Sequence, residues 1–226
     1  MAGRRVLGMT EYRQEFDNEL EAIESKVIEL FAMVAEGLPA ATRALLDGDS
    51  DVFATLLERD REIDMVYHEV EELANKELVL QAPVADDLRF LLSVLRIVPE
   101  LERSHDLVVH IAASAGRFLG DDLSPRVRAL VDQMGAISAK MWRQTADAWY
   151  QRDRTAADEL TDRDEGLDEL RSSLIAELAS SGLRVSVAMD MALIARDYER
   201  LGAHAVNIAR RVIYLAGTIP REQPDE

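Results

Sequence analysis

Apolar residues recur at steps of three and four along almost the whole chain, and few helix breakers interrupt them. Between Tyr12 and Leu46 the apolar positions include Phe16, Leu20, Ile23, Val27, Leu30 and Val34. This spacing places one apolar stripe along an α-helix. The 226 residues include only six prolines and eleven glycines, which suits long helices and few turns. The sequence therefore predicts an all-α fold.

Turn-forming segments divide this pattern into six long helices. Breaks occur at "DGDSD" (47–51), "QAP" (81–83), "GDDLSP" (120–125), around 153, and at "SSGL" (180–183). We expect helices over about 12–46, 50–80, 84–118, 125–152, 154–180 and 184–216. Asp49 or Ser50 is suited to capping the second helix, and Pro83 and Pro125 to the first turns of the third and fourth. Long helices joined by short turns pack antiparallel in bundles.

Two phrases occur twice in the chain. "ERDREID" (58–64) resembles "DRDEGLD" (162–168), and "ELERSHDLVVHIA" (100–112) resembles "DYERLGAHAVNIA" (197–209). A duplicated three-helix unit accounts for both pairs. We therefore expect two tandem three-helix bundles, over 9–120 and 121–216. An N-terminal extension over 1–8 would precede them, and a disordered tail over 217–226 would follow.

Composition narrows the classes of partner and the compartment. The net charge of −17 disfavours binding to nucleic acid or anionic lipid and favours cations or basic protein surfaces. The absence of cysteine excludes disulfides and thiolate metal sites. No segment is apolar enough to insert into a membrane, and the start "MAGRRVLGM" lacks the apolar core of a signal peptide. We expect a cytoplasmic protein.

Acidic residues pair at a spacing of four on both copies of the repeat. The pairs are Asp60 with Asp64, Glu102 with Asp106, and Asp164 with Asp168, whereas Glu199 faces Ala203. With 43 acidic residues, about eight such pairs arise by chance. Two features set these pairs apart. The first is that the acids occupy positions where core residues are expected, as in the ladder of Leu88, Leu92, Leu95, Pro99, Glu102, Asp106 and Val109.

The second feature is their level in the predicted hairpin. Both pairs of the first half lie about 30 Å from its turn at ~1.5 Å per residue. Four carboxylates facing one groove would repel one another unless a cation neutralised them. All-oxygen ligands favour Mg²⁺, Mn²⁺, Ca²⁺ or iron, and a nitrogen from His105 would shift the preference toward iron or zinc. The sequence therefore predicts a metal site.

The segments "APVADDLRFLLSVLRIVPELERSHDLVVHIA" (82–112) and "MALIARDYERLGAHAVNIA" (191–209) closely resemble the signature helices of the PhoU family of phosphate-uptake regulators. The likeness extends over roughly residues 9 to 216. It implies two similar three-helix bundles with Glu/Asp-x-x-x-Asp motifs that hold metal ions, namely iron, zinc, manganese or magnesium. Carried over by position, the implied ligands are Asp60, Asp64, Glu102, Asp106, Asp164, Asp168 and Glu199.

The chain departs from the family pattern at three positions. Ala203 stands where the family usually has aspartate, so the second site loses a ligand. Ser104 and His105 replace the usual apolar residue and glycine of the first copy.

The resemblance implies a homodimeric, non-enzymatic regulator in the cytoplasm. Such proteins link the phosphate ABC transporter to a sensor histidine kinase and restrain phosphate uptake and the starvation response. Two alternatives stay open. One is a metal-free helical adaptor or paralogue. The other is a carboxylate-bridged di-iron enzyme, which needs two Glu-x-x-His motifs, whereas this chain has only Glu102 with His105.

Overall fold

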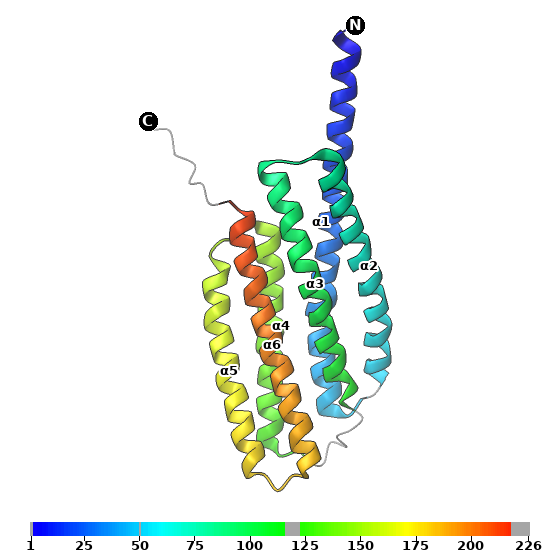
Figure 1. Cartoon of the computed structure of the whole chain (residues 1–226). Coiled ribbons are helices and arrows are strands. Elements are labelled where there is room, and N and C mark those ends of the chain that lie inside the picture. The colour runs from blue at the N-terminus through cyan, green and yellow to red at the C-terminus, as the bar shows by residue number, and fades with distance from the viewer. Residues whose placement is uncertain (1, 50, 116–122, 218–226) are drawn as a thin grey trace, which may run out of the picture.

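The computed structural model describes residues 2–49, 51–115 and 123–217, with side chains from residue 13 onward. Its elements, shown in Figure 1, are α1 (Ala2–Asp47), α2 (Asp51–Gln81), α3 (Ala85–Ala113), α4 (Pro125–Gln151), α5 (Ala156–Ser180) and α6 (Val185–Leu215). These described residues contain no strand. The predicted all-α class and the six long helices are confirmed.

The helix ends differ from the prediction in three places. The first helix begins at Ala2, so it includes residues 2–8 of the predicted extension over 1–8. The third ends at Ala113 and not near 118, and Pro83 lies in the link before it, not in its first turn. The predicted boundary at 120/121 and residues 218–226 of the predicted tail fall outside the described residues.

Local capping explains where two of the helices start. The Asp49 side chain accepts a hydrogen bond from the Asp51 backbone N–H at 3.0 Å at the start of α2. The Ser124 hydroxyl accepts from the Val127 N–H at 3.2 Å, and Pro125 occupies the first turn of α4. These groups satisfy backbone donors that have no partner within the helix.

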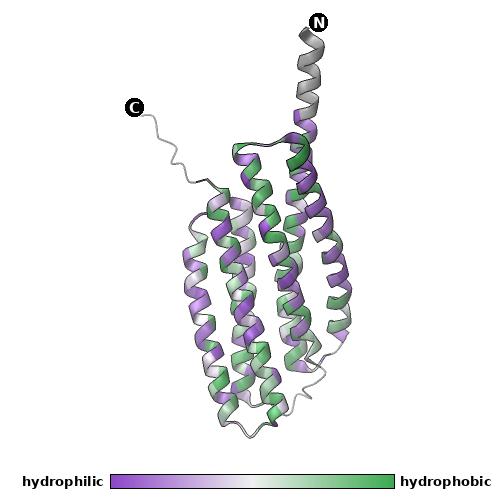
Figure 2. Ribbon diagram, in the orientation of Figure 1, coloured by the Kyte–Doolittle hydropathy of each residue, from purple (hydrophilic) through white to green (hydrophobic). Residues whose placement is uncertain are grey.

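The two halves pack side by side. In the first half α1, α2 and α3 pack together, and in the second α4, α5 and α6 do so. The halves join through α1 against α4 and α3 against α6, which leaves α2 and α5 on opposite flanks (Figure 1). Figure 2 shows hydrophobic and hydrophilic positions interleaved along each helix, as expected for amphipathic helices.

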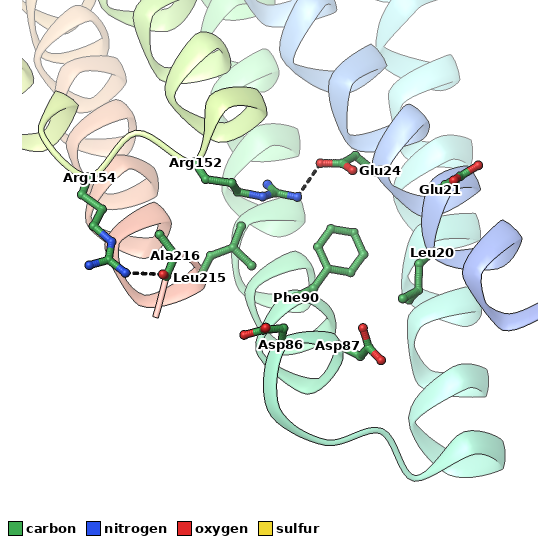
Figure 3. A pocket seen from close by; sticks show the side chains of 10 residues that line it. All are labelled: Leu20, Glu21, Glu24, Asp86, Asp87, Phe90, Arg152, Arg154, Leu215 and Ala216. Atoms are coloured by element: carbon green, nitrogen blue, oxygen red, sulfur yellow. Dashed lines mark hydrogen bonds and ion pairs between the residues drawn. The ribbon is translucent and has the colours of Figure 1, made fainter. Parts of the chain in front are cut away.

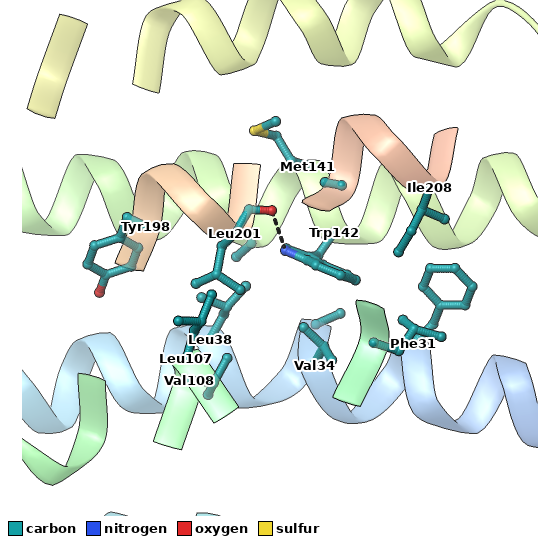
Figure 4. Close-up of a cluster of buried hydrophobic side chains, with 14 of the residues drawn as sticks. Phe31, Val34, Leu38, Leu107, Val108, Met141, Trp142, Tyr198, Leu201 and Ile208 are labelled. Carbon is teal, nitrogen blue, oxygen red and sulfur yellow. Dashed lines mark hydrogen bonds between the residues drawn. The ribbon is translucent and has the colours of Figure 1, made fainter. Parts of the chain in front are cut away.

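The interior of the molecule is one continuous apolar cluster that includes both halves. At its centre Trp142 of α4 is fully buried and donates its indole N–H to the Leu201 carbonyl of α6 at 3.2 Å (Figure 4). Phe31 of α1 contacts the same indole, with ring centroids 6.4 Å apart. The two three-helix bundles therefore share a core.

The burial pattern repeats at the spacing of the duplicated phrases. Leu56, Ile63 and Val70 of α2 are buried, and the residues 104 positions later on α5 are also buried. Those partners are Leu160, Leu167 and Leu174. The two outer helices thus present the same face to the core, which places their acidic residues on equivalent flanks.

Polar contacts join α3 to α6 in a pseudo-symmetric pattern. Asn207 donates to Glu100 at 3.2 Å, and His110 donates to Asp197 at 2.6 Å. A shift of 97 positions converts Glu100 into Asp197 and His110 into Asn207, so the two contacts are equivalent. Because α3 and α6 run antiparallel, the halves are related by an approximate two-fold axis across this seam (Figure 1).

Candidate cation-binding groove

Four carboxylates from two helices interact between α2 and α3. The α2 helix buries Leu56 and Ile63, and between them Asp60 is half-buried, while Asp64 is exposed. Burial raises the pKa of Glu102 on α3 above its usual value, and repulsion from the carboxylates of Asp106, Asp64 and Asp60 raises it further. We call the set Asp60, Asp64, Glu102 and Asp106 the first acidic groove.

The pKa of Asp106 is also raised, first by burial and then by Asp60 and Asp64. The structure therefore brings all four residues of the first acidic groove within electrostatic range of one another. Like charges held together in a partly desolvated place destabilise the fold unless a positive charge compensates them.

His105 lies beside the first acidic groove and holds one of its carboxylates in place. Its ring is fully buried, and Nδ1 lies 3.0 Å from Asp60 Oδ1. Burial lowers the pKa of His105, and the effect outweighs the raising effect of Asp60. The neutral ring thus donates its Nδ1 proton to Asp60. Its Nε2 faces the interior near Gly37 and has no hydrogen-bond partner.

We call Asp164, Asp168 and Glu199 the second acidic groove, which lies between α5 and α6. Burial raises the pKa of Asp164, and the carboxylates of Asp168 and Glu199 raise it further. Arg171 lies within the set, with its Nε 3.1 Å from Glu199 and 4.0 Å from Asp168. This groove therefore holds a positive charge of its own.

Sequence reasoning missed the role of Arg171. The position 104 residues earlier is Tyr67, so the first acidic groove has no cation at the matching place. That difference between the copies was a usable signal, because the acids match by position while their neighbours do not. The second acidic groove lacks one acid, at Ala203, and gains one base.

The two grooves also differ where α2 and α5 approach their partner helices. A Cβ atom at Gly202 would lie 2.5 Å from Asp164 Oδ1, so glycine makes room for that carboxylate. The equivalent residue 97 positions earlier is His105, which contacts Asp60 through its ring. Asp164 thus lies directly against α6, whereas Asp60 is held by an imidazole.

In the part of the chain that the structure describes, no three His, Asp or Glu side chains converge closely enough to bind one ion together. The donor chemistry of the first acidic groove still fits a hard cation, because its ligands are carboxylate oxygens. Binding there would draw the four side chains inward from their present positions.

A hollow also lies at one end of the bundle, and the sequence did not predict it. It has a volume of about 540 Å³. Its lining comes from α1, α3, α6 and the link between α4 and α5 (Figure 3). Arg152 reaches across it to Glu24 at 2.5 Å and lies over the Phe90 ring. Three of its four acidic residues are paired with arginines, since Asp86 also pairs with Arg89 and Asp87 with Arg13. This hollow therefore has less unbalanced charge than the first acidic groove.

Comparison with known proteins identifies the same architecture elsewhere. The family model described as "PhoU domain" matches residues 27–115 and 131–212. The phosphate-specific transport system accessory protein PhoU homolog 1 of Mycobacterium leprae is 29% identical over 93% of this chain and 96% of its own length. The PhoU homolog of Zymomonas mobilis is 31% identical over 89% of this chain and 86% of its own.

Two solved structures share the fold. The crystal structure of PhoU from Pseudomonas aeruginosa superposes with a TM-score of 0.83 at 29% identity, over 88% of this chain and 98% of that one. The phosphate transport system regulatory protein PhoU from Streptococcus pneumoniae gives 0.80 at 25% identity, over 88% and 96%. Because the family model matches both halves and well over half of the residues, this chain belongs to the PhoU family.

Proposed function

We propose that the chain is an accessory protein of a phosphate-specific transport system. In this role it restrains phosphate uptake and phosphate-starvation signalling. It acts in the cytoplasm as a non-enzymatic adaptor between the transporter and a sensor histidine kinase. The observation that carries the proposal is the match of both halves to the PhoU family, together with relatives named as phosphate-specific transport system accessory proteins.

No helix among the described residues is long and apolar enough to cross a membrane. The single Glu-x-x-His pair, Glu102 with His105, has its imidazole buried and hydrogen-bonded to Asp60. That histidine is a poor candidate for a di-iron ligand, so the enzyme alternative gains no support. A homodimer stays a prediction.

The first acidic groove is the proposed cation site. Asp60, Asp64, Glu102 and Asp106 would hold the ion, which would supply the positive charge that this groove lacks. Magnesium and manganese suit the four oxygen donors, as does iron, whereas zinc would need the His105 nitrogen that Asp60 now uses. The second acidic groove binds less well because Arg171 already pairs with Glu199.

Deletion of the gene in its own organism tests the regulatory role. Cells without the protein should express starvation genes, read as alkaline phosphatase activity, even in phosphate-rich medium. A plasmid copy of the wild-type gene should restore repression. Normal repression in the deletion strain, once any second PhoU gene has also been removed, would contradict the role.

A further inference from the structure

A small groove on the seam between α3 and α6 is lined by two arginines, and it lies apart from both acidic grooves. Its volume is about 190 Å³. Its lining consists of Arg96, Ile97, Glu100, Asn207, Ile208 and Arg211. With about 30 Å³ for each water molecule, the groove has room for a small ion and part of its hydration shell.

Neither arginine has a carboxylate partner among the described residues. Arg96 makes no hydrogen bond or ion pair in that part of the chain. Arg211 reaches the Leu92 carbonyl at 3.4 Å and lies 4.0 Å over the Tyr214 ring. Its Nε is buried without a hydrogen-bond partner. A buried donor without a partner requires an explanation such as a bound ion or water.

The charge around the groove favours an anion. Burial lowers the pKa of Arg211, and repulsion from Arg96 lowers it further. The one acid in the lining, Glu100, accepts from Asn207 at 3.2 Å and lies 4.0 Å from Arg103. Glu100 stands four residues after Arg96, yet the two side chains form no ion pair. Its charge is therefore shared with other groups.

The arginine pair does not come from the internal repeat. A shift of 97 positions places Leu193 opposite Arg96 and Ser114 opposite Arg211. The Glu100–Asn207 contact does have its equivalent in Asp197–His110. The two guanidinium groups were thus added to one side of a seam whose other contacts are pseudo-symmetric.

We propose that this groove binds a small oxyanion of the phosphate class, either free phosphate or a phosphate monoester. Arg96 and Arg211 donate N–H groups to its oxygens, and the second N–H of Asn207 is available as a further donor. Planar guanidinium groups match the oxygens of phosphate, and two positive charges suit a dianion. The inference goes beyond the proposed function and does not depend on it.

Binding of inorganic phosphate and of glycerol phosphate to the purified full chain tests this site. Calorimetry at constant ionic strength should detect at least one of the two, and the one that binds identifies the source of the phosphate group. Arg96→Gln or Arg211→Gln should weaken binding about tenfold each. The double variant should abolish it. The control is Arg196→Gln, at an exposed arginine of α6 that lies outside the groove. It removes the same charge and should leave binding unchanged.

Arg96→Lys with Arg211→Lys separates charge from geometry, because lysine keeps the charge but loses the planar donor pair. This variant should bind more weakly than wild type. Circular dichroism checks that each variant is helical, and the single variants replace the double one if it fails to fold. The proposal is overturned if neither ligand binds, or if binding is equal in wild type and in the folded glutamine variants.

Discussion

Three single-residue differences between the copies make the two acidic grooves unlike. The first acidic groove has Asp106 and Tyr67 where the second half has Ala203 and Arg171. His105 of the first half corresponds to Gly202. As a result, no described arginine forms an ion pair with the four carboxylates of the first acidic groove, where the Arg103 charge only partly offsets the repulsion on Glu102. In the second, Arg171 pairs with Glu199 at 3.1 Å.

Removing two carboxylates from the first acidic groove should stabilise the metal-free protein in a pH-dependent manner. The pKa values of Glu102 and Asp106 in the folded state are raised above the ordinary 4.5 and 3.8. The folded protein therefore loses stability as pH rises through the raised pKa values and these carboxyls ionise. Glu102→Gln with Asp106→Asn should therefore melt a few degrees above wild type at pH 7 and close to it at pH 3.5.

Thermal melts in the presence of a chelator measure this difference. Glu15→Gln with Glu29→Gln, two exposed positions of α1, is the control for the change in net charge. A melting-point difference that did not vary with pH would show that carboxylate repulsion is not its origin.

At the scale of helices, close approach of α4 to α1 depends on Gly135. A Cβ atom there would lie 2.9 Å from Thr42 Cβ and even closer to the rest of that buried side chain. Gly135→Ala should destabilise the fold by about 1–3 kcal/mol through overpacking. At Gly166 of α5 a Cβ would meet nothing within 4 Å. Gly166→Ala should stabilise by up to ~1 kcal/mol through helix propensity. Urea unfolding of both variants tests the pair, and equal effects would contradict this packing.

The two tryptophans of α4 provide a second matched pair. Both are fully buried, but Trp142 donates to the Leu201 carbonyl whereas the Trp149 indole N–H has no partner. Trp142→Phe should cost about 1 kcal/mol more than Trp149→Phe, because only the first substitution removes a hydrogen bond. Chemical unfolding measures the difference, and a larger cost at Trp149 would contradict the assignment of that bond.

The sequence was enough to predict the helices and the repeat, since both follow from apolar spacing and repeated phrases. It also placed the four carboxylates of the first acidic groove at one level of the hairpin, but the individual contacts between side chains of different helices were beyond it. The pairing of Arg171 with Glu199 and of His110 with Asp197 depends on side chains from different helices. Apolar periodicity does not specify how each helix is rotated about its own axis, so it does not predict these pairs. The shortening of α3 to Ala113 was missed because apolar residues continue past the point where the helix ends.

For the whole molecule, the shared core predicts cooperative unfolding. The cluster around Trp142 draws on α1, α3, α4 and α6, so neither half retains a complete core alone (Figure 4). The full chain should melt in one transition, and fragments 1–120 and 121–216 should show little stable helix. Circular dichroism on all three chains tests this, and a fragment that melts cooperatively near the temperature of the whole protein would contradict it.

Cation binding by the two acidic grooves is the most direct test of the charge difference between the halves. Calorimetry with Mn²⁺ and Mg²⁺ should be performed on wild type, on Glu102→Gln with Asp106→Asn, and on Asp164→Asn with Asp168→Asn, once circular dichroism has checked that each protein is helical. The first acidic groove should be the site, because no arginine pairs with its carboxylates. The first double variant should therefore lose binding, and the second should keep it. Binding that survives in the first variant, or disappears only in the second, would contradict the assignment.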